Sequence, residues 1–391
     1  MDLDARIRRR QRRNDERRLI RDDESLSPVA HVAEPSDRGP VFERLLDHLD
    51  PVFDGTLPPN AYVHGPFGAG KSAVVTALVT HLGRLSSETG SVIHTSTRAA
   101  SPPSPGFVYV DLRETTSEFA FYHRVLDALA EDAVPEHGVS TQTLRDRLHD
   151  LLGASRSGVV VAVDHVSEPD TADTDGLVEL FAGLPSNVSW LAVGRDDPEE
   201  TRLTEYTATS IRVDAYQRQM LVDVLMTRAS AALARRALDH RLARRIAAWA
   251  DGNAHDALAA LFVAAVRASR ADRTHVSERD VDAAVAEIPQ PSASLARALA
   301  LPANKQLVLG HLVALDAADR ASVSATTEAI SDRPDVDLTR GTVKRYLYEM
   351  AEAGIVERVQ SERRDGKGRP PSRVELRVPP TAFRRLYDRA Q

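Results

Sequence analysis

Eight consecutive residues have the types and spacing of a phosphate-binding loop, G-x-x-x-x-G-K-[ST]; they are Gly65, Pro66, Phe67, Gly68, Ala69, Gly70, Lys71 and Ser72. Glycines at such positions let backbone N–H groups turn inward around a phosphate. Lys71 would reach the β- and γ-phosphates of a nucleoside triphosphate, and the Ser72 hydroxyl would bind Mg²⁺. The sequence therefore predicts a site for ATP or ADP together with Mg²⁺.

A loop of this kind requires a strand before it and a helix after it, and the sequence contains both. Residues 61–64 (AYVH) are β-prone, and residues 72–82 (SAVVTALVTHL) have apolar side chains at helical spacing without Gly or Pro. The N-terminus of that helix would add its positive dipole to the site. This context favours a nucleotide site over the alternative, a chance glycine-rich turn.

A second acidic residue is needed to hold Mg²⁺, and Asp164 is the candidate. It closes the apolar run at residues 159–164 (VVVAVD), which is typical of a central parallel strand. The carboxyl end of such a strand lies beside the phosphate loop, although the alternative is an Asp that only ends the strand. Many hydrolysing proteins of this kind carry Glu directly after the Asp, whereas this chain has His165. A neutral imidazole can accept a proton but lacks the charge that orients water strongly. We therefore expect nucleotide binding with slow or lost hydrolysis.

Strands and helices alternate through the first half of the chain, which predicts a parallel α/β sheet with helices on both faces. The expected strands are residues 61–64, 107–111, 159–164, 188–193 and 209–213. After Asp214 the pattern is wholly helical, with expected helices at 215–234, 238–250, 254–270 and 277–287. Residues 86–106 are rich in Ser, Thr and Pro and are expected to form a loop. The predicted organisation is an N-terminal arm (1–25), an α/β domain (26–214), a helical domain (215–288) and a C-terminal domain (292–391).

The composition excludes several classes of protein. The chain of 391 residues contains no cysteine, which excludes disulfide scaffolds and thiol catalysis. No run of 18 apolar residues is present, and the first residues are charged rather than hydrophobic. We therefore expect a soluble, cytoplasmic protein with no membrane partner.

Basic residues are concentrated at the two ends of the chain, although the net charge is −7. Residues 1–21 hold nine arginines against four acidic residues, and residues 338–391 hold thirteen basic against seven acidic residues. A basic C-terminal end on an acidic body points to contact with a polyanion, and the alternative is a solvated charged surface. The N-terminal arm is expected to be a helix or disordered. Its arginines could add nonspecific affinity or pair with acids on the body.

The order of these parts resembles that of the archaeal origin-recognition/Cdc-type replication initiators, which are AAA+ ATPases. The resemblance extends from about Ile20 to Leu386. Residues 60–74 (NAYVHGPFGAGKSAV) look like the family's phosphate-loop block, and residues 213–228 (VDAYQRQMLVDVLMTR) look like its segment entering the lid. Residues 301–312 (LPANKQLVLGHL) look like the opening of its winged helix. Residues 338–356, followed by Gly366-Lys-Gly-Arg369, look like its recognition helix and wing.

The resemblance implies a P-loop AAA+ sheet with helices on both faces, an all-helical lid domain and a C-terminal winged-helix domain. It adds Ala73, Tyr216 and Arg228 to the expected nucleotide-binding residues. It also implies double-stranded DNA as a partner, and other initiator subunits or a replicative helicase as further partners.

Departures from the family pattern fall around the γ-phosphate. The family's first sensor, usually Asn after the fourth strand, falls near Arg195, and its second sensor, usually an Arg in the lid, falls at His255. Imidazole has fewer donors than guanidinium for a γ-phosphate. We expect catalysis, where it survives, to depend on Asp164, His165, Arg195 and His255. Arg202 is a candidate for the family's arginine finger.

The C-terminal segment contains a candidate DNA-binding surface. A winged helix places a recognition helix in the major groove and a β-hairpin along the backbone. The helix is expected to start near residues 337–339 and to end at Gly354, with Val343, Leu347 and Met350 on its core face. Basic and polar side chains of its first half and of the hairpin are the expected DNA contacts: Thr342, Lys344, Arg345, Arg363, Arg364, Lys367, Arg369 and Arg373. Glu349 and Glu352 would repel phosphate from its second half.

Two functions share all of these residues. One is an ATP-binding replication initiator that recognises origin DNA and regulates initiation. The other is a P-loop, winged-helix regulator of transcription or defence that does not act at origins. The family resemblance favours the first, whereas His165 and His255 argue against a third hypothesis, a motor ATPase.

Overall fold

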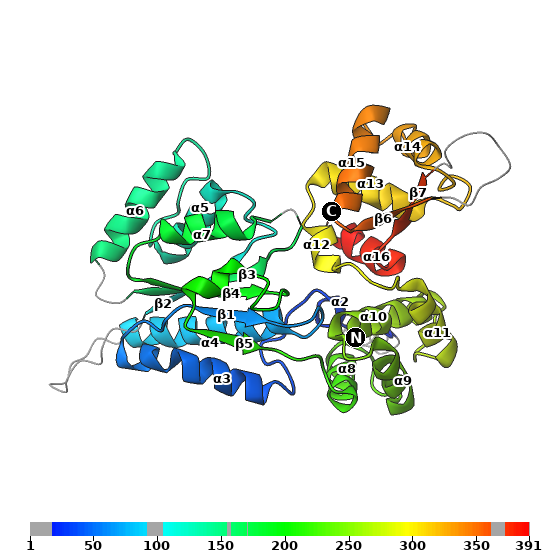
Figure 1. The fold of residues 1–391 in the computed structure, drawn as a ribbon. Coiled ribbons are helices and arrows are strands. Elements are labelled where there is room, and N and C mark those ends of the chain that lie inside the picture. The colour runs from blue at the N-terminus through cyan, green and yellow to red at the C-terminus, as the bar shows by residue number, and fades with distance from the viewer. Residues whose placement is uncertain (1–17, 92–104, 155–157, 170, 361–371, 391) are drawn as a thin grey trace, which may run out of the picture. The chain divides into compact units, whose positions relative to one another are not determined.

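The computed structural model describes residues 18–91, 105–154, 158–169, 171–360 and 372–390 (Figure 1). The chain divides into two compact units. We call residues 31–215 the sheet unit, and residues 1–30 together with 216–391 the helical unit.

The sheet unit is built on five parallel strands in the order β2-β3-β4-β1-β5. The strands are β1 (Ala61–His64), β2 (Gly106–Asp111), β3 (Val159–Val166), β4 (Val188–Gly194) and β5 (Thr209–Arg212). β3 lies between β2 and β4 and is buried on both faces, which is why its sequence is a continuous apolar run. The predicted parallel α/β sheet is confirmed.

Helices cover both faces of this sheet (Figure 1). Alternate side chains of β3 point to opposite faces. Val161 and Val163 pack with α5 (Glu118–Leu129), α6 (Thr141–Ala154) and α7 (Thr174–Ala182). Val160 and Ala162 pack with α3 (Gly39–Leu49) and α4 (Lys71–Ser91). The described residues of this unit also form two short 3₁₀ helices, η1 (Asp50–Asp54) and η2 (Arg202–Tyr206).

One sequence prediction about this unit is wrong in part. Residues 86–106 were expected to form a loop, but α4 continues to Ser91, and β2 begins at Gly106. Residues 92–104 lie outside the described part of the chain. The Ser and Thr residues in 86–91 have lower helix propensity than Ala, but they do not stop a helix that is already packed against the sheet.

The helical unit has one continuous apolar core that extends from Leu19 to Phe383. Its first part consists of α2 (Asp23–Leu26), α8 (Arg218–Ala232), α9 (His240–Ala250), α10 (Ala254–Arg270) and α11 (Glu278–Glu287). α10 is buried on nearly all sides, and its many alanines allow the neighbouring helices to approach closely. The end of the predicted N-terminal arm takes part in this core, because Leu19 is buried and Ile20 forms a bridge with Leu233.

The second part of the helical unit has the element order of a winged helix. It consists of α12 (Leu295–Leu299), α13 (Ala303–Ala314), α14 (Val323–Ser331), α15 (Arg340–Glu352), β6 (Val356–Gln360), β7 (Ser372–Leu376) and α16 (Pro380–Ala390). β6 and β7 form an antiparallel hairpin. Gly354 has a φ of 69°, the left-handed conformation that ends a helix, as its position after α15 predicts.

Replacing Phe262 by Ala should destabilise the helical unit. Its side chain is fully buried in α10, so the change should lower the free energy of unfolding by about 3–5 kcal/mol. The matched control is Phe53→Ala: Phe53 is 58% exposed, so its replacement should change the free energy by less than about 0.5 kcal/mol. Urea unfolding followed by Trp249 fluorescence in a Trp190→Phe background measures this unit, and equal effects of the two changes would contradict the core assignment.

Candidate nucleotide and DNA sites

The phosphate loop lies between β1 and the first residue of α4, as its sequence predicts. Gly65, Gly68 and Gly70 have φ angles of 146°, 76° and 79°, which residues other than glycine rarely adopt. A Cβ atom on Gly65 would lie 2.1 Å from the carbonyl oxygen of Val213. The loop thus depends on glycine for its conformation and for its close approach to the segment after β5.

Lys71 occupies the first position of α4 and is largely buried. Its Nζ donates hydrogen bonds to the carbonyl oxygens of Gly65 (2.7 Å) and Pro66 (2.9 Å). Burial lowers the pKa of Lys71 to about 8, and the charge of Arg195 contributes, although Asp164 and Glu168 oppose the shift. The amine is therefore held within the loop at a helix N-terminus, where an anionic ligand is favoured.

Asp164 lies near the carboxyl end of β3, and it is almost completely buried. Its Oδ2 accepts a hydrogen bond from the Tyr109 hydroxyl (2.7 Å), and its Oδ1 accepts one from the backbone N–H of His165 (2.7 Å). Each oxygen retains a lone pair with which it could bind a cation. In the described parts of the chain, no three acidic or histidine side chains are arranged to hold a metal ion together. A Mg²⁺ ion held by Ser72 and Asp164 would therefore need phosphate and water oxygens for its other ligands.

His165 has three carboxylates around its ring. Its Nδ1 lies 3.1 Å from Glu168 Oε1, and its Nε2 lies 3.7 Å from Asp164 Oδ2 and 3.8 Å from Asp111 Oδ2. Burial alone would lower the pKa of this imidazole, but the carboxylates outweigh burial and raise the pKa. His165 is therefore more readily protonated than the neutral imidazole that the sequence hypothesis assumed.

Glu168 is a charged residue of this site that the sequence reasoning missed. Its Oε1 accepts a hydrogen bond from Arg195 Nη2 at 2.6 Å, and the Arg195 guanidinium lies 4.4 Å from the centre of the Phe67 ring in the phosphate loop. Burial would raise the pKa of Glu168, but His165 and Arg195 lower it to about 2. An acidic residue four positions after Asp164 is the sequence signal that could have found it.

Two further charged residues next to the site also escaped the sequence analysis. Asp111 ends β2 in register with Asp164 and is paired with Arg113, whose Nε donates to Asp111 Oδ1 at 2.9 Å. Arg38 is buried, and its Nη2 donates a hydrogen bond to the carbonyl oxygen of Ala69 at 2.5 Å. This hydrogen bond stabilises the phosphate loop. No sequence motif marks either residue, because the pairing of strands and the path of the N-terminal segment bring them to the site.

The other predicted nucleotide-site residues, Tyr216, Arg228 and His255, belong to the helical unit. Arg228 in α8 donates hydrogen bonds to the carbonyl oxygens of Ser25 (2.8 Å) and Ala30 (2.5 Å), and burial lowers the pKa of its guanidinium. The backbone N–H of Tyr216 donates to the carbonyl oxygen of Gly252 (3.0 Å). In this arrangement Arg228 fixes residues 25–30, which precede the sheet unit in the sequence.

His255 is bound to the start of the winged-helix part. Its Nε2 accepts a hydrogen bond from the backbone N–H of Leu295 (3.1 Å), and its Nδ1 lies 3.0 Å from Asp256 Oδ1. Burial would raise the pKa of Asp256, but hydrogen bonds from His255, Ser292 and Gln290 lower it. These contacts connect α10 directly to the segment that precedes α12.

Arg202, the candidate arginine finger, lies in η2 and is about half exposed. Its Nη1 lies 2.5 Å from Asp175 Oδ1, and its Nε lies 3.9 Å from Glu205 Oε1. Both partners are themselves exposed, so these surface pairs hold the side chain only weakly.

The candidate recognition helix is α15. Thr339 caps its N-terminus by accepting a hydrogen bond from the N–H of Thr342 (3.2 Å). Val343, Leu347 and Met350 are buried on one side, as expected, while Lys344 and Arg345 are exposed. The first half of the helix therefore offers its positive charge to solvent.

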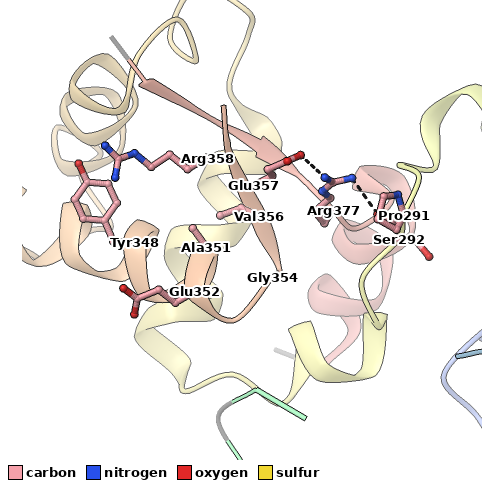
Figure 2. Close-up of a pocket in the computed structure, with 10 residues that line it drawn as sticks. All are labelled: Pro291, Ser292, Tyr348, Ala351, Glu352, Gly354, Val356, Glu357, Arg358 and Arg377. Atoms are coloured by element: carbon pink, nitrogen blue, oxygen red, sulfur yellow. Dashed lines mark hydrogen bonds and ion pairs between the residues drawn. The ribbon is translucent and has the colours of Figure 1, made fainter. Parts of the chain in front are cut away.

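The second half of α15 carries acids and borders a mixed-charge pocket. Glu349 pairs with Lys305 at 3.1 Å. A pocket of about 550 Å³ lies between the end of α15, β6 and the segment at 291–292. Figure 2 shows the residues that line it. Glu352 and Glu357 line it together with Arg358 and Arg377, so charges of both signs meet there.

The wing offers fewer described residues. Arg373 at the start of β7 pairs with Glu375, Nε to Oε1 at 2.9 Å. Four predicted DNA contacts lie outside the described residues, namely Arg363, Arg364, Lys367 and Arg369.

No helix in the described part of the chain is both long and apolar enough to cross a bilayer.

The chain is similar to known proteins over most of its length. Residues 37–193 match the family described as AAA ATPase domain. The chain is 23% identical over 95% of its length to the ORC1-type DNA replication protein of Thermococcus kodakarensis, covering 91% of that protein. It is 25% identical over 85% of its length to ORC1-type DNA replication protein 5 of Halobacterium salinarum, covering 82% of that protein.

Solved structures share the fold over most of the chain. The Aeropyrum pernix ORC1 protein, solved in complex with DNA, superposes with a TM-score of 0.64 at 24% identity, over 95% of this chain and 97% of that one. The Aeropyrum pernix ORC2 protein, solved in ADPNP–ADP complexes, gives a TM-score of 0.56 at 18% identity, over 95% and 98%.

The sheet unit, with its phosphate loop and Asp-tipped central strand, is thus a P-loop AAA+ ATPase domain. The chain as a whole is similar over most of its length to ORC1-type DNA replication proteins, as the resemblance in its sequence predicted.

Nucleotide binding should take up protons at pH 8. The pKa of Lys71 is about 8, so about half of these amines are neutral at that pH, and phosphates beside Nζ would raise the pKa. Calorimetric titrations with ATP in buffers of different ionisation enthalpy should show an uptake of about 0.5 proton. Lys71→Arg is the control, because its guanidinium is always charged and removes this uptake. The same uptake in both proteins would contradict the role of Lys71.

Proposed function

We propose that this protein binds ATP and double-stranded DNA as a replication initiator that recognises origin DNA and regulates initiation. The observation that carries the nucleotide part is the glycine-dependent loop, with Lys71 inside it and Asp164 beside it at the edge of the sheet. The AAA ATPase match and the adenine-nucleotide complexes of a protein with the same fold support it.

Mg²⁺ is part of the proposal. When bound, it would neutralise phosphate charge, and Ser72 and Asp164 are the residues that would hold it. We propose that Lys71 positions the phosphates, while the buried Tyr109 hydroxyl fixes the orientation of Asp164.

The DNA-binding part rests on α15 and the hairpin that follows it. Lys344 and Arg345 are exposed in the first half of the helix, and Arg345 Nε lies 3.7 Å from Glu349 Oε1 of the second half. The ORC1 protein of the same fold was solved with DNA, which favours the same role for this surface. Recognition of an origin, and partnership with other initiator subunits or a helicase, are the finer parts of the proposal.

Hydrolysis is proposed to be slow. No carboxylate follows Asp164 directly, and His165 stands there among three carboxylates that favour its protonated form. A protonated imidazole donates hydrogen bonds and cannot accept a proton from water. Turnover should therefore fall well below that of AAA+ proteins with Glu at this position.

Replacing Lys71 by Ala should abolish ATP binding. The change removes the only amine inside the loop, so the affinity for a fluorescent ATP analogue should fall at least about 100-fold. Lys305→Ala is the matched control, because Lys305 lies on α13 and pairs with Glu349. Unchanged affinity in the Lys71 variant would refute the nucleotide site.

Replacing Arg345 by Ala should weaken DNA binding and reduce its dependence on salt. Each phosphate contact that is lost should lower the slope of log K against log [salt] by about 0.9. Fluorescence anisotropy with duplex DNA at several salt concentrations measures both quantities, and Arg279→Ala, an exposed arginine of α11, is the control. An equal slope in wild type and the Arg345 variant would remove α15 from the DNA interface.

The origin part is tested by comparing duplexes. Intergenic DNA from beside the protein's own gene should bind more tightly than random duplex of equal length and base composition. Equal affinity for both would favour a regulator of another kind over an origin-recognition protein.

A further inference from the structure

Glu168 lies at the edge of the sheet, and one of its two carboxylate oxygens has no hydrogen-bond partner. Its side chain is only 4% exposed, and its Oε1 is shared by Arg195 Nη2 (2.6 Å) and His165 Nδ1 (3.1 Å). Its Oε2 is buried and has no hydrogen-bond partner. A buried, ionised oxygen without a donor is costly, so this atom points to a donor that the protein itself does not supply.

The backbone between Asp164 and Glu168 has an unusual conformation. The register of β3 against β4 shifts between Asp164 and Val166, and His165 and Ser167 both have φ angles in the left-handed region, 67° and 59°. The turn is closed by hydrogen bonds, because the Thr171 hydroxyl donates to the carbonyl oxygen of Glu168 at 2.6 Å. Two residues in this sparsely populated conformation are the kind of strain that functional sites retain.

The surroundings place this carboxylate on the phosphate side of the site. Arg195, which holds Oε1, lies against Phe67 of the phosphate loop, and the charges of Arg195, Asp164 and Glu168 all act on Lys71. Glu168 therefore shares one cluster of charges with the residue that would contact the terminal phosphates.

We propose that Glu168 orients the water that attacks the γ-phosphate, through a hydrogen bond from that water to Oε2. This assignment rests on the proposed ATP binding and deepens it. Glu168 would supply, from three residues further along the chain, the negative charge that is missing at His165. His165 and Arg195 are positioning residues, because they fix Oε1 and leave Oε2 for the water.

His165 is less suited to this role. Its Nδ1 faces Glu168, and its Nε2, although without a hydrogen-bond partner, lies between Asp164 and Asp111. Among three carboxylates the ring donates hydrogen bonds rather than accepting them.

The reaction balances without a general base of high pKa. The water oxygen forms a bond to the γ-phosphorus, and the bond from that phosphorus to the β–γ bridging oxygen breaks, with its electron pair leaving on ADP. One water proton moves to an oxygen of the transferred phosphoryl group, so that ATP⁴⁻ and water give ADP³⁻ and H₂PO₄⁻. Glu168 accepts a hydrogen bond throughout and remains ionised.

The test measures nucleotide affinity and turnover separately in the full-length protein. Glu168→Gln keeps the shape of the side chain but replaces an acceptor oxygen by an amide donor. Phosphate release from ATP and Mg²⁺ in single-turnover conditions should slow at least about tenfold, the lower end of effects expected for a group that acts on the reacting water. The affinity for a fluorescent ATP analogue should weaken by less than about threefold, because the loss falls on the transition state. Glu179→Gln, on the exposed side of α7, is the matched control and should change neither quantity.

A second variant covers the case in which the amide is not tolerated. Glu168→Asp keeps the charge that pairs with Arg195 but withdraws the carboxylate by one methylene, and it should slow phosphate release to a similar extent. Unchanged turnover in a folded Glu168 variant would overturn the proposal. It would also be overturned if wild-type turnover were no faster than that of Lys71→Ala while wild type still bound ATP, an outcome that leaves the proposed nucleotide binding intact.

Discussion

The burial of several charges at one edge of a parallel sheet is the constraint on which the sheet unit depends. Lys71, Asp164, His165 and Glu168 are all largely buried, and isolated charges in such a position would be expensive. They are tolerated because each faces an opposite charge or a hydrogen-bond partner, such as Tyr109 for Asp164 and Arg195 for Glu168. A network of this kind is stable only as a whole, since removal of one partner leaves another buried charge uncompensated.

The same network of charges favours the binding of an anion. Lys71 is bound to carbonyl groups of its own loop, and burial together with Arg195 makes its positive charge unfavourable. A triphosphate would relieve this cost by bringing negative charge to the amine and to the N–H groups at the start of α4. Binding of the ligand thus offsets the free-energy cost of burying the charged amine.

The helical unit also contains a buried charge that is compensated by hydrogen bonds, at the connection between the lid and the winged helix. Asp256 is buried in the first turn of α10, where it accepts hydrogen bonds from Ser292 and Gln290, and the adjacent His255 accepts one from Leu295. These polar contacts occur within a continuous apolar core, so they set the direction in which the chain leaves the lid rather than supply most of the stability. His255, which the sequence analysis expected at the position of the family's second sensor, contacts the winged-helix part in this structure.

Local sequence determined the phosphate loop, the strands and most helices of this protein. Glycines with positive φ, the apolar run of β3, and the Thr339 cap and Gly354 end of α15 are properties of a few neighbouring residues, so their signals could be interpreted without a structure. Tertiary structure decided which side chains meet at the site. Glu168 reaches Arg195 because a strained turn reverses the chain after β3, and Asp111 faces Asp164 because β2 pairs with β3. Such contacts depend on the register and path of segments distant in sequence, which residue types and spacing do not encode locally.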